Sequence, residues 1–198
     1  MELSGAVGIV TGGATGIGHA VCLELARAGV KGVVVNYSRS AAEAEATAKE
    51  LAGLGVEALA VKADVAREDE VVAMVEAAAE RFGRIDVLVN NAGTTRFIPF
   101  SDLEAVTDEV WRHILGVNLM GPWYASRAAA PHLKRSHGCI VNIASIPPLR
   151  ASGSSLPYGV SNAALPPPPT ALPLHPPPPA RAPAATPRLR ARPWLPQH

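Results

Sequence analysis

The sequence has few of the features that mark secreted, membrane-bound or metal-binding proteins. It contains only two cysteines, Cys22 and Cys139, which is too few for a disulfide scaffold. No apolar run reaches the ~18 residues of a membrane span. Residues 1–10 run straight into a strand-like stretch and leave no room for a targeting peptide, so we expect a cytoplasmic location. The histidines show no metal-ligand spacing, and we expect no metal site.

Charge is also scarce and unevenly spread. The 198 residues carry a formal net charge of +1, with 18% charged and 48% hydrophobic residues, which is typical of a folded domain with a core. This balance speaks against a nucleic-acid-binding or membrane-surface protein. All 17 acidic residues lie between Glu2 and Glu109, and 13 of the 19 prolines lie in residues 166–198. We therefore predict a folded domain over 1–165 and a disordered, proline-rich tail over 166–198.

Within the predicted domain, short apolar runs alternate with longer helix-like segments. The predicted strands are Ala6–Thr11, Gly32–Tyr37, Glu57–Val61, Ile85–Asn90 and Cys139–Ser145. The predicted helices are Ile17–Ala28, 41–52, Arg67–Phe82 and Leu103–Ala129, the last bent at Pro122. This alternation predicts an α/β fold, a Rossmann-type doubly wound parallel sheet. Ligands of such sheets bind beyond the carboxyl ends of the strands.

A glycine-rich turn follows the first predicted strand. Gly12, Gly16 and Gly18 have the spacing G-x-x-x-G-x-G between that strand and the next helix. Glycine allows a tight turn and a close approach of the backbone to a diphosphate, while the helix N-terminus presents free N–H groups to the anion. The pattern therefore favours nucleotide binding over a turn that is merely tight.

The turn resembles the T-G-x-x-x-G-x-G motif of the short-chain dehydrogenase/reductase family. Further matches are Asn90-Asn91-Ala92-Gly93 after the fourth strand and Asp64-Val65 after the third, and the resemblance covers residues 3–165. Members closest in character are 3-oxoacyl-carrier-protein reductases and similar sugar or alcohol dehydrogenases. The cofactor-binding residues that the resemblance and the motifs predict are Gly12, Thr15, Gly16, Ile17, Gly18, Asn36, Ser38, Arg39, Asp64, Val65, Asn91, Ala92, Gly93 and Asn162.

The end of the second predicted strand points to the choice of cofactor. An acid there would accept hydrogen bonds from the 2′-hydroxyl of NAD, but this chain has Asn36-Tyr37-Ser38-Arg39. Arg39 and Ser38 can hold a phosphate, so we predict NADP in preference to NAD. The resemblance implies that Asp64 binds the adenine amino group.

The resemblance also implies a chemistry. Family members transfer hydride between nicotinamide and a carbonyl or alcohol carbon, with Tyr158 as the acid/base, Ser145 as the orienting donor and Asn118 as the relay residue. The family's lysine, four residues after the tyrosine, lowers the pKa of that tyrosine and binds the cofactor ribose. Here Asn162 stands at that position. A neutral amide can bond the ribose but supplies no charge, and we expect little activity.

A second departure begins after Leu165. The family continues with further helices and strands, and this chain continues with a proline-rich segment. Alternatives to an active NADP-dependent reductase therefore remain open: a non-catalytic nucleotide-binding pseudoenzyme, an aberrant splice or frame product with little activity, and an interaction protein that acts through its tail. We expect a small carbonyl or alcohol as the ligand partner, no nucleic acid, no membrane, and an impaired form of the family's homo-oligomer. Candidate substrate contacts are Thr94, Thr95, Arg96 and Ile146–Arg150.

Overall fold

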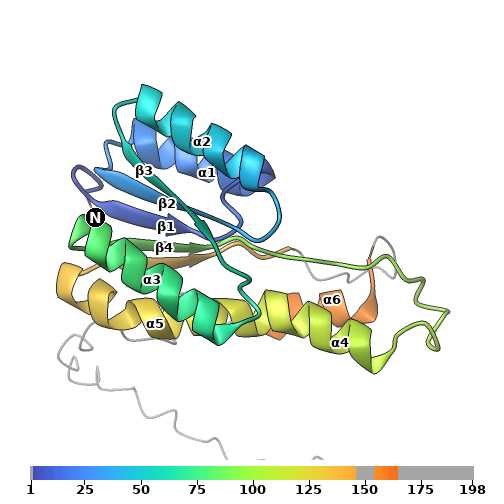
Figure 1. Ribbon diagram of the computed structural model, residues 1–198. Coiled ribbons are helices and arrows are strands. Elements are labelled where there is room, and N and C mark those ends of the chain that lie inside the picture. The colour runs from blue at the N-terminus through green and yellow to red at the C-terminus, as the bar shows by residue number, and fades with distance from the viewer. Residues whose placement is uncertain (1, 146–153, 165–198) are drawn as a thin grey trace, which may run out of the picture.

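The computed structural model describes residues 2–145 and 154–164. The predicted tail at 166–198 and the candidate substrate contacts at Ile146–Arg150 lie outside the described residues. The described part contains a five-stranded sheet with helices on both faces (Figure 1).

All strands of this sheet run parallel, in the order β3-β2-β1-β4-β5. Their bounds are β1 Val7–Val10, β2 Gly32–Tyr37, β3 Glu57–Lys62, β4 Val87–Asn90 and β5 Cys139–Asn142. The apolar runs form the central strands because a parallel sheet covered on both faces buries every side chain of a strand. The prediction of a doubly wound parallel α/β fold is confirmed. β5 ends before the predicted Ser145.

Two helix pairs bury the two faces of the sheet. α1 (Gly16–Arg27) and α2 (Ala41–Gly53) cover one face, while α3 (Glu68–Phe82) and α5 (Gly121–Ser136) cover the other (Figure 1). Each face has its own apolar cluster, because successive side chains of a strand point to opposite sides. The two clusters fix the helices on the sheet, whose carboxyl edge forms the candidate site.

The helical segment before β5 differs from its prediction. Instead of one helix over Leu103–Ala129, the chain forms α4 (Asp108–Leu115), the π-helical turn η1 (Gly116–Met120) and α5 in succession. The helical segment starts later than predicted because Thr107 caps α4, its hydroxyl accepting from the N–H of Val110. Pro122, where a bend was predicted, lies in the first turn of α5, directly after η1.

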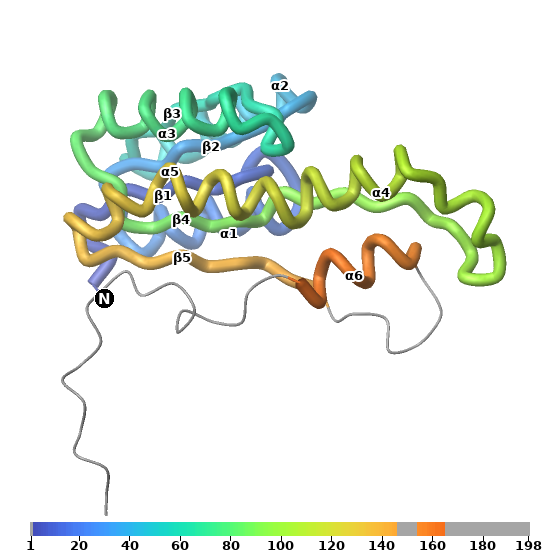
Figure 2. Tube along the Cα trace, turned by 90° about the horizontal axis from the view of Figure 1, so that it is seen from below, coloured from blue at the N-terminus to red at the C-terminus, as the bar shows by residue number. Residues whose placement is uncertain are grey.

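The last described helix, α6 (Leu156–Ala164), lies beside α4 beyond the carboxyl edge of the sheet (Figure 2). β5 pairs with β4 alone and is an edge strand within the described sheet. Its Val141 side chain is exposed. Among the helices of the described residues, none is both long and apolar enough to cross a bilayer.

Candidate functional site

A cavity of about 640 Å³ opens at the carboxyl ends of β1 to β4. This volume lies within the range of ligand pockets in proteins, which is about 300–1,000 Å³. Many predicted cofactor-binding residues line it together: Gly12, Thr15, Asn36, Ser38, Arg39, Asp64, Val65, Asn91, Ala92 and Gly93. Gly16, Ile17, Gly18 and Asn162 are not among its lining residues. The fold thus gathers segments that are far apart in the sequence at one edge of the sheet.

The glycine-rich turn requires glycine, because a side chain would be strained at its positive φ angles or would clash with neighbouring atoms. Gly12 and Gly16 have positive φ angles of 62° and 55°. A Cβ on Gly18 would lie 2.1 Å from the carbonyl oxygen of Gly12 and 2.5 Å from Nδ2 of Asn91. The turn leads into α1, whose N-cap Thr15 makes no side-chain capping bond. The first N–H groups of α1 therefore remain available to an anion. Ile17 is 64% exposed beside them.

Asn36 lies at the centre of the site but turns its polar atoms to the backbone. Its side chain is 1% exposed, and its Oδ1 accepts from the N–H of Gly12 at 3.1 Å. Its Nδ2 donates to the carbonyl of Ala63 at 3.0 Å and lies 3.4 Å from the carbonyl oxygen of Val61. The amide thus joins the glycine-rich turn to the end of β3. It acts by positioning those segments rather than by reaching into the cavity.

A second set of bonds holds the glycine-rich turn against β4. The hydroxyl of Thr11 accepts from the N–H groups of Asn91 and Ala92, at 2.9 and 3.0 Å. The side chain of Asn91 donates to the carbonyls of Thr11 and Gly12, at 2.9 and 3.1 Å. Sequence reasoning missed Thr11, although its place at the start of the motif was a usable signal.

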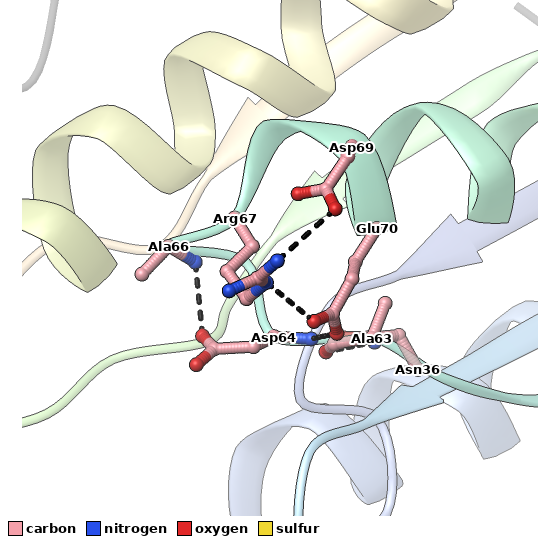
Figure 3. A network of polar contacts seen from close by, with 7 residues as sticks. All are labelled: Asn36, Ala63, Asp64, Ala66, Arg67, Asp69 and Glu70. Atoms are coloured by element: carbon pink, nitrogen blue, oxygen red, sulfur yellow. Dashed lines mark hydrogen bonds and ion pairs between the residues drawn. The ribbon is translucent and has the colours of Figure 1, made fainter.

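Asp64 lies in the turn between β3 and α3, inside a charged network (Figure 3). One of its carboxylate oxygens accepts from the N–H of Ala66 at 3.0 Å, and its own N–H donates to Glu70 at 2.8 Å. Glu70 also pairs with Nε of Arg67 at 2.7 Å, and Arg67 bonds Asp69 at 3.2 Å. Arg67 is the N-cap residue of α3. The carboxylate of Asp64 is held at the cavity wall by its own turn.

This network also determines which cations of the cavity are already engaged. The hydrogen bond that Arg67 donates to Asp69, and next the charges of Asp69 and Glu70, raise the pKa of Arg67, and the same hydrogen bond lowers the pKa of Asp69. Arg39 lines the same cavity, is exposed, and takes part in none of the ion pairs of the described residues. It remains available to an anionic ligand.

Cys22 packs behind the glycine-rich turn, and its thiol is not a nucleophile. Burial raises the pKa of Cys22 to about 12, so the thiol stays protonated at neutral pH. Across residues 2–145 and 154–164, no group of three or more His, Cys, Asp or Glu side chains could hold a metal ion.

The three predicted catalytic residues lie outside the cavity lining but within one hydrogen-bond network. Asn162 on α6 is its centre: Oδ1 accepts from the N–H of Ser145 at 2.8 Å, and Nδ2 donates to the carbonyl of Tyr158 at 3.0 Å. Tyr158 is half-buried against the apolar cluster of Ile98, Val110 and Ile114. In the described part of the chain, no hydrogen bond joins the hydroxyls of Ser145 and Tyr158.

Asn118 connects this network to the cavity. Its Oδ1 accepts from the N–H of Thr94 at 2.8 Å, and its Nδ2 donates to the carbonyl of Thr94 at 2.9 Å. Nδ2 also donates to the hydroxyl of Ser161 at 3.0 Å, and that hydroxyl donates to the carbonyl of Tyr158 at 2.8 Å. Thr94 lines the cavity. Sequence reasoning missed Ser161, a buried serine that carries no motif of its own.

The geometry of the turn generates a prediction for Gly18→Ala. The new methyl group would displace the backbone of Gly12 or the side chain of Asn91, and such overpacking costs about 1–3 kcal/mol of unfolding free energy. Gly53→Ala is the matched control, because a Cβ there meets no atom within 4 Å. Urea unfolding followed by circular dichroism measures both. Equal stability of Gly18→Ala and the wild type would contradict the packing described here.

Comparisons with known proteins show which family this chain resembles. The short chain dehydrogenase family matches residues 6–166. The chain is 51% identical over 157 residues to "Granaticin polyketide synthase putative ketoacyl reductase 2" from Streptomyces violaceoruber, covering 79% of this chain and 61% of that protein. It is 38% identical over 162 residues to a 3-oxoacyl-[acyl-carrier-protein] reductase from Synechocystis, covering 81% of this chain and 64% of the relative.

A solved structure shows the same fold. It is a short chain dehydrogenase from Burkholderia cenocepacia in complex with NADP, with a TM-score of 0.74 and 38% identity over 83% of this chain and 66% of that one. The chain spans less than two thirds of the length of the two sequence relatives. Because the family matches most of the chain, over the whole described sheet and the glycine-rich turn, this protein belongs to the short chain dehydrogenase family.

Proposed function

We propose that the cavity binds a nicotinamide dinucleotide, and NADP in preference to NAD. The observation that carries this proposal is the cavity itself, in which a glycine-rich turn, a free helix N-terminus and the unpaired Arg39 meet. The residues present fit such a ligand: Gly16 leaves room for a diphosphate, because no atom lies within 4 Å of where its Cβ would be, and no acid stands at the end of β2. The NADP complex of the Burkholderia cenocepacia relative supports the same choice.

Most of the predicted residues then have a role in holding the dinucleotide; Asn36 instead fixes the turn at Gly12, and Asn162 bonds Ser145 and Tyr158. The N–H groups at the start of α1, from Thr15 to Gly18, receive the diphosphate. Ser38 and Arg39 receive the 2′-phosphate of the adenosine ribose. Asp64 accepts from the adenine amino group beside the backbone of Val65. Segment 91–93, anchored on Thr11, and the exposed Ile17 flank the ribose and nicotinamide.

We further propose that the reaction is the reduction of a carbonyl, with a 3-oxoacyl thioester as the leading substrate class. The nicotinamide supplies hydride when it is bound. Tyr158 gives a proton to the substrate oxygen, and the hydroxyl of Ser145 donates a hydrogen bond to that oxygen. Asn118 holds the segment at Thr94 and its bonded neighbour Ser161 in place, and so orders the proton path. The names of the relatives from Streptomyces violaceoruber and Synechocystis support this substrate class.

We propose that Asn162 limits the turnover of this chain. Its neutral amide supplies no positive charge at Tyr158, and both its ends are engaged by backbone groups. Loss of one fixed electrostatic group typically costs about 10²–10³ in rate. We therefore propose low turnover for this chain, with cofactor binding retained.

The choice of cofactor is tested by isothermal titration with NADP and with NAD. We expect tighter binding of NADP, and we expect Arg39→Ala to weaken it by roughly tenfold because a charge-assisted hydrogen bond is lost. Arg27→Ala is the control, since Arg27 is exposed at the far end of α1 and does not line the cavity. Equal affinities for the two dinucleotides, or an Arg39→Ala protein with wild-type affinity for NADP, would refute the proposal.

The catalytic proposal is tested by NADPH oxidation with an acetoacetyl thioester. We expect little turnover by the wild type and a gain of at most about 10² in Asn162→Lys, because the added charge acts near Tyr158. The gain is incomplete because lysine cannot accept the hydrogen bond from the N–H of Ser145. Tyr158→Phe is the control and removes the remaining activity. Robust wild-type turnover would contradict the role given to Asn162, and activity retained in Tyr158→Phe would contradict the role of Tyr158.

A further inference from the structure

Lys62 is a cation of the cavity that the sequence motifs do not single out. It is the last residue of β3, and the parallel register places it directly opposite Tyr37, the last residue of β2. Ala58 and Ala60 pack into the apolar cluster on the side of α1 and α2, and Tyr37 packs against the same cluster. Because side chains alternate along a strand, Lys62 lies on that same face. Lys62 is exposed and lines the cavity together with Tyr37, Ser38 and Arg39.

The charge of Lys62 is not used by the protein itself. Among the ion pairs of the described residues none involves Lys62, whereas Arg67 is held by Asp69 and Glu70. Arg39 and Lys62 are thus the two unpaired cations of the lining. Arg39 lies just after β2 and Lys62 is the last residue of the neighbouring strand β3.

The charge balance of the cavity depends on this lysine. The lining carries three Arg or Lys side chains, Arg39, Lys62 and Arg67, and two acidic ones, Asp64 and Glu70. Without Lys62 the lining would be formally neutral, and a phosphate monoester carries a charge of about −1.5 to −2 near neutral pH. One exposed arginine facing such a group leaves about a third to a half of its charge uncompensated.

We infer that Lys62 is a second cation for the 2′-phosphate of the dinucleotide and, with Arg39, determines the preference for NADP. This inference rests on the proposed function, because it concerns the same site. The guanidinium of Arg39 forms a planar fork, and the ammonium of Lys62 acts as a point charge on a flexible stem. The two groups approach the phosphate from the ends of adjacent strands.

The test compares two small ligands that differ by this phosphate alone, adenosine 2′,5′-bisphosphate and 5′-AMP. Isothermal titration measures both with the wild type, Lys62→Met, Lys62→Arg and the control Lys49→Met, whose lysine is exposed on α2 away from the cavity. We expect Lys62→Met to weaken the bisphosphate by roughly tenfold and to leave 5′-AMP unchanged. Lys62→Arg keeps most of the affinity, and Lys49→Met keeps all of it.

The outcomes separate the two claims. A wild type that binds the bisphosphate no better than 5′-AMP overturns the NADP proposal and the role of Lys62 together. A wild type that prefers the bisphosphate, with an unchanged preference in Lys62→Met, overturns the role of Lys62 and leaves the NADP proposal standing. An equal loss of both ligands in Lys62→Met, which thermal unfolding would trace to a damaged fold, also overturns it, since a specificity-determining residue acts on the 2′-phosphate alone.

Discussion

The buried amide of Asn36 is the contact on which the candidate site depends. It accepts from Gly12 on one side and donates to Ala63 on the other, so the ends of β1, β2 and β3 keep fixed positions relative to one another. A buried polar group stabilises a fold only when its hydrogen bonds are made, and breaking one leaves its partner unpaired at a cost of about 1–3 kcal/mol. The geometry of the cavity follows from this one side chain together with Thr11, which ties the same turn to β4.

The acidic and basic side chains of the cavity differ in whether they have partners within the protein. The acids near the cavity are engaged by their own turn: Asp64 by the N–H of Ala66, and Glu70 by Arg67 and the N–H of Asp64. The cations at the ends of β2 and β3 are left without partners among the described residues. An anionic ligand therefore meets positive groups that need not break an ion pair first. Such preorganisation favours phosphate binding, because little free energy is lost in rearranging the protein.

The order and type of most elements could be predicted from the sequence, because apolar runs and helix-like segments alternate over most of the chain. The π-helical turn around Asn118 could not be predicted, because its residues fit an α-helix equally well and the bonds of Asn118 to Thr94 and Ser161 join segments far apart in the sequence. The glycine-rich turn was visible from its spacing. That the side chain of Asn36 bonds the backbone of Gly12 and Ala63 could not be predicted, because an amide at a strand end can face either a ligand or the backbone. Asn162 was recognised as a departure, while its bond to the N–H of Ser145 depends on how α6 lies in three dimensions.

Hydrogen exchange with and without NADP tests most directly that the edge of the sheet is a dinucleotide site. We predict slower exchange on addition of NADP in the glycine-rich turn at 11–18 and in the turn at 63–67, which meet at Asn36, with no change at the far ends of α3 and α5. Unchanged exchange in both turns, at NADP concentrations that saturate binding, would contradict it.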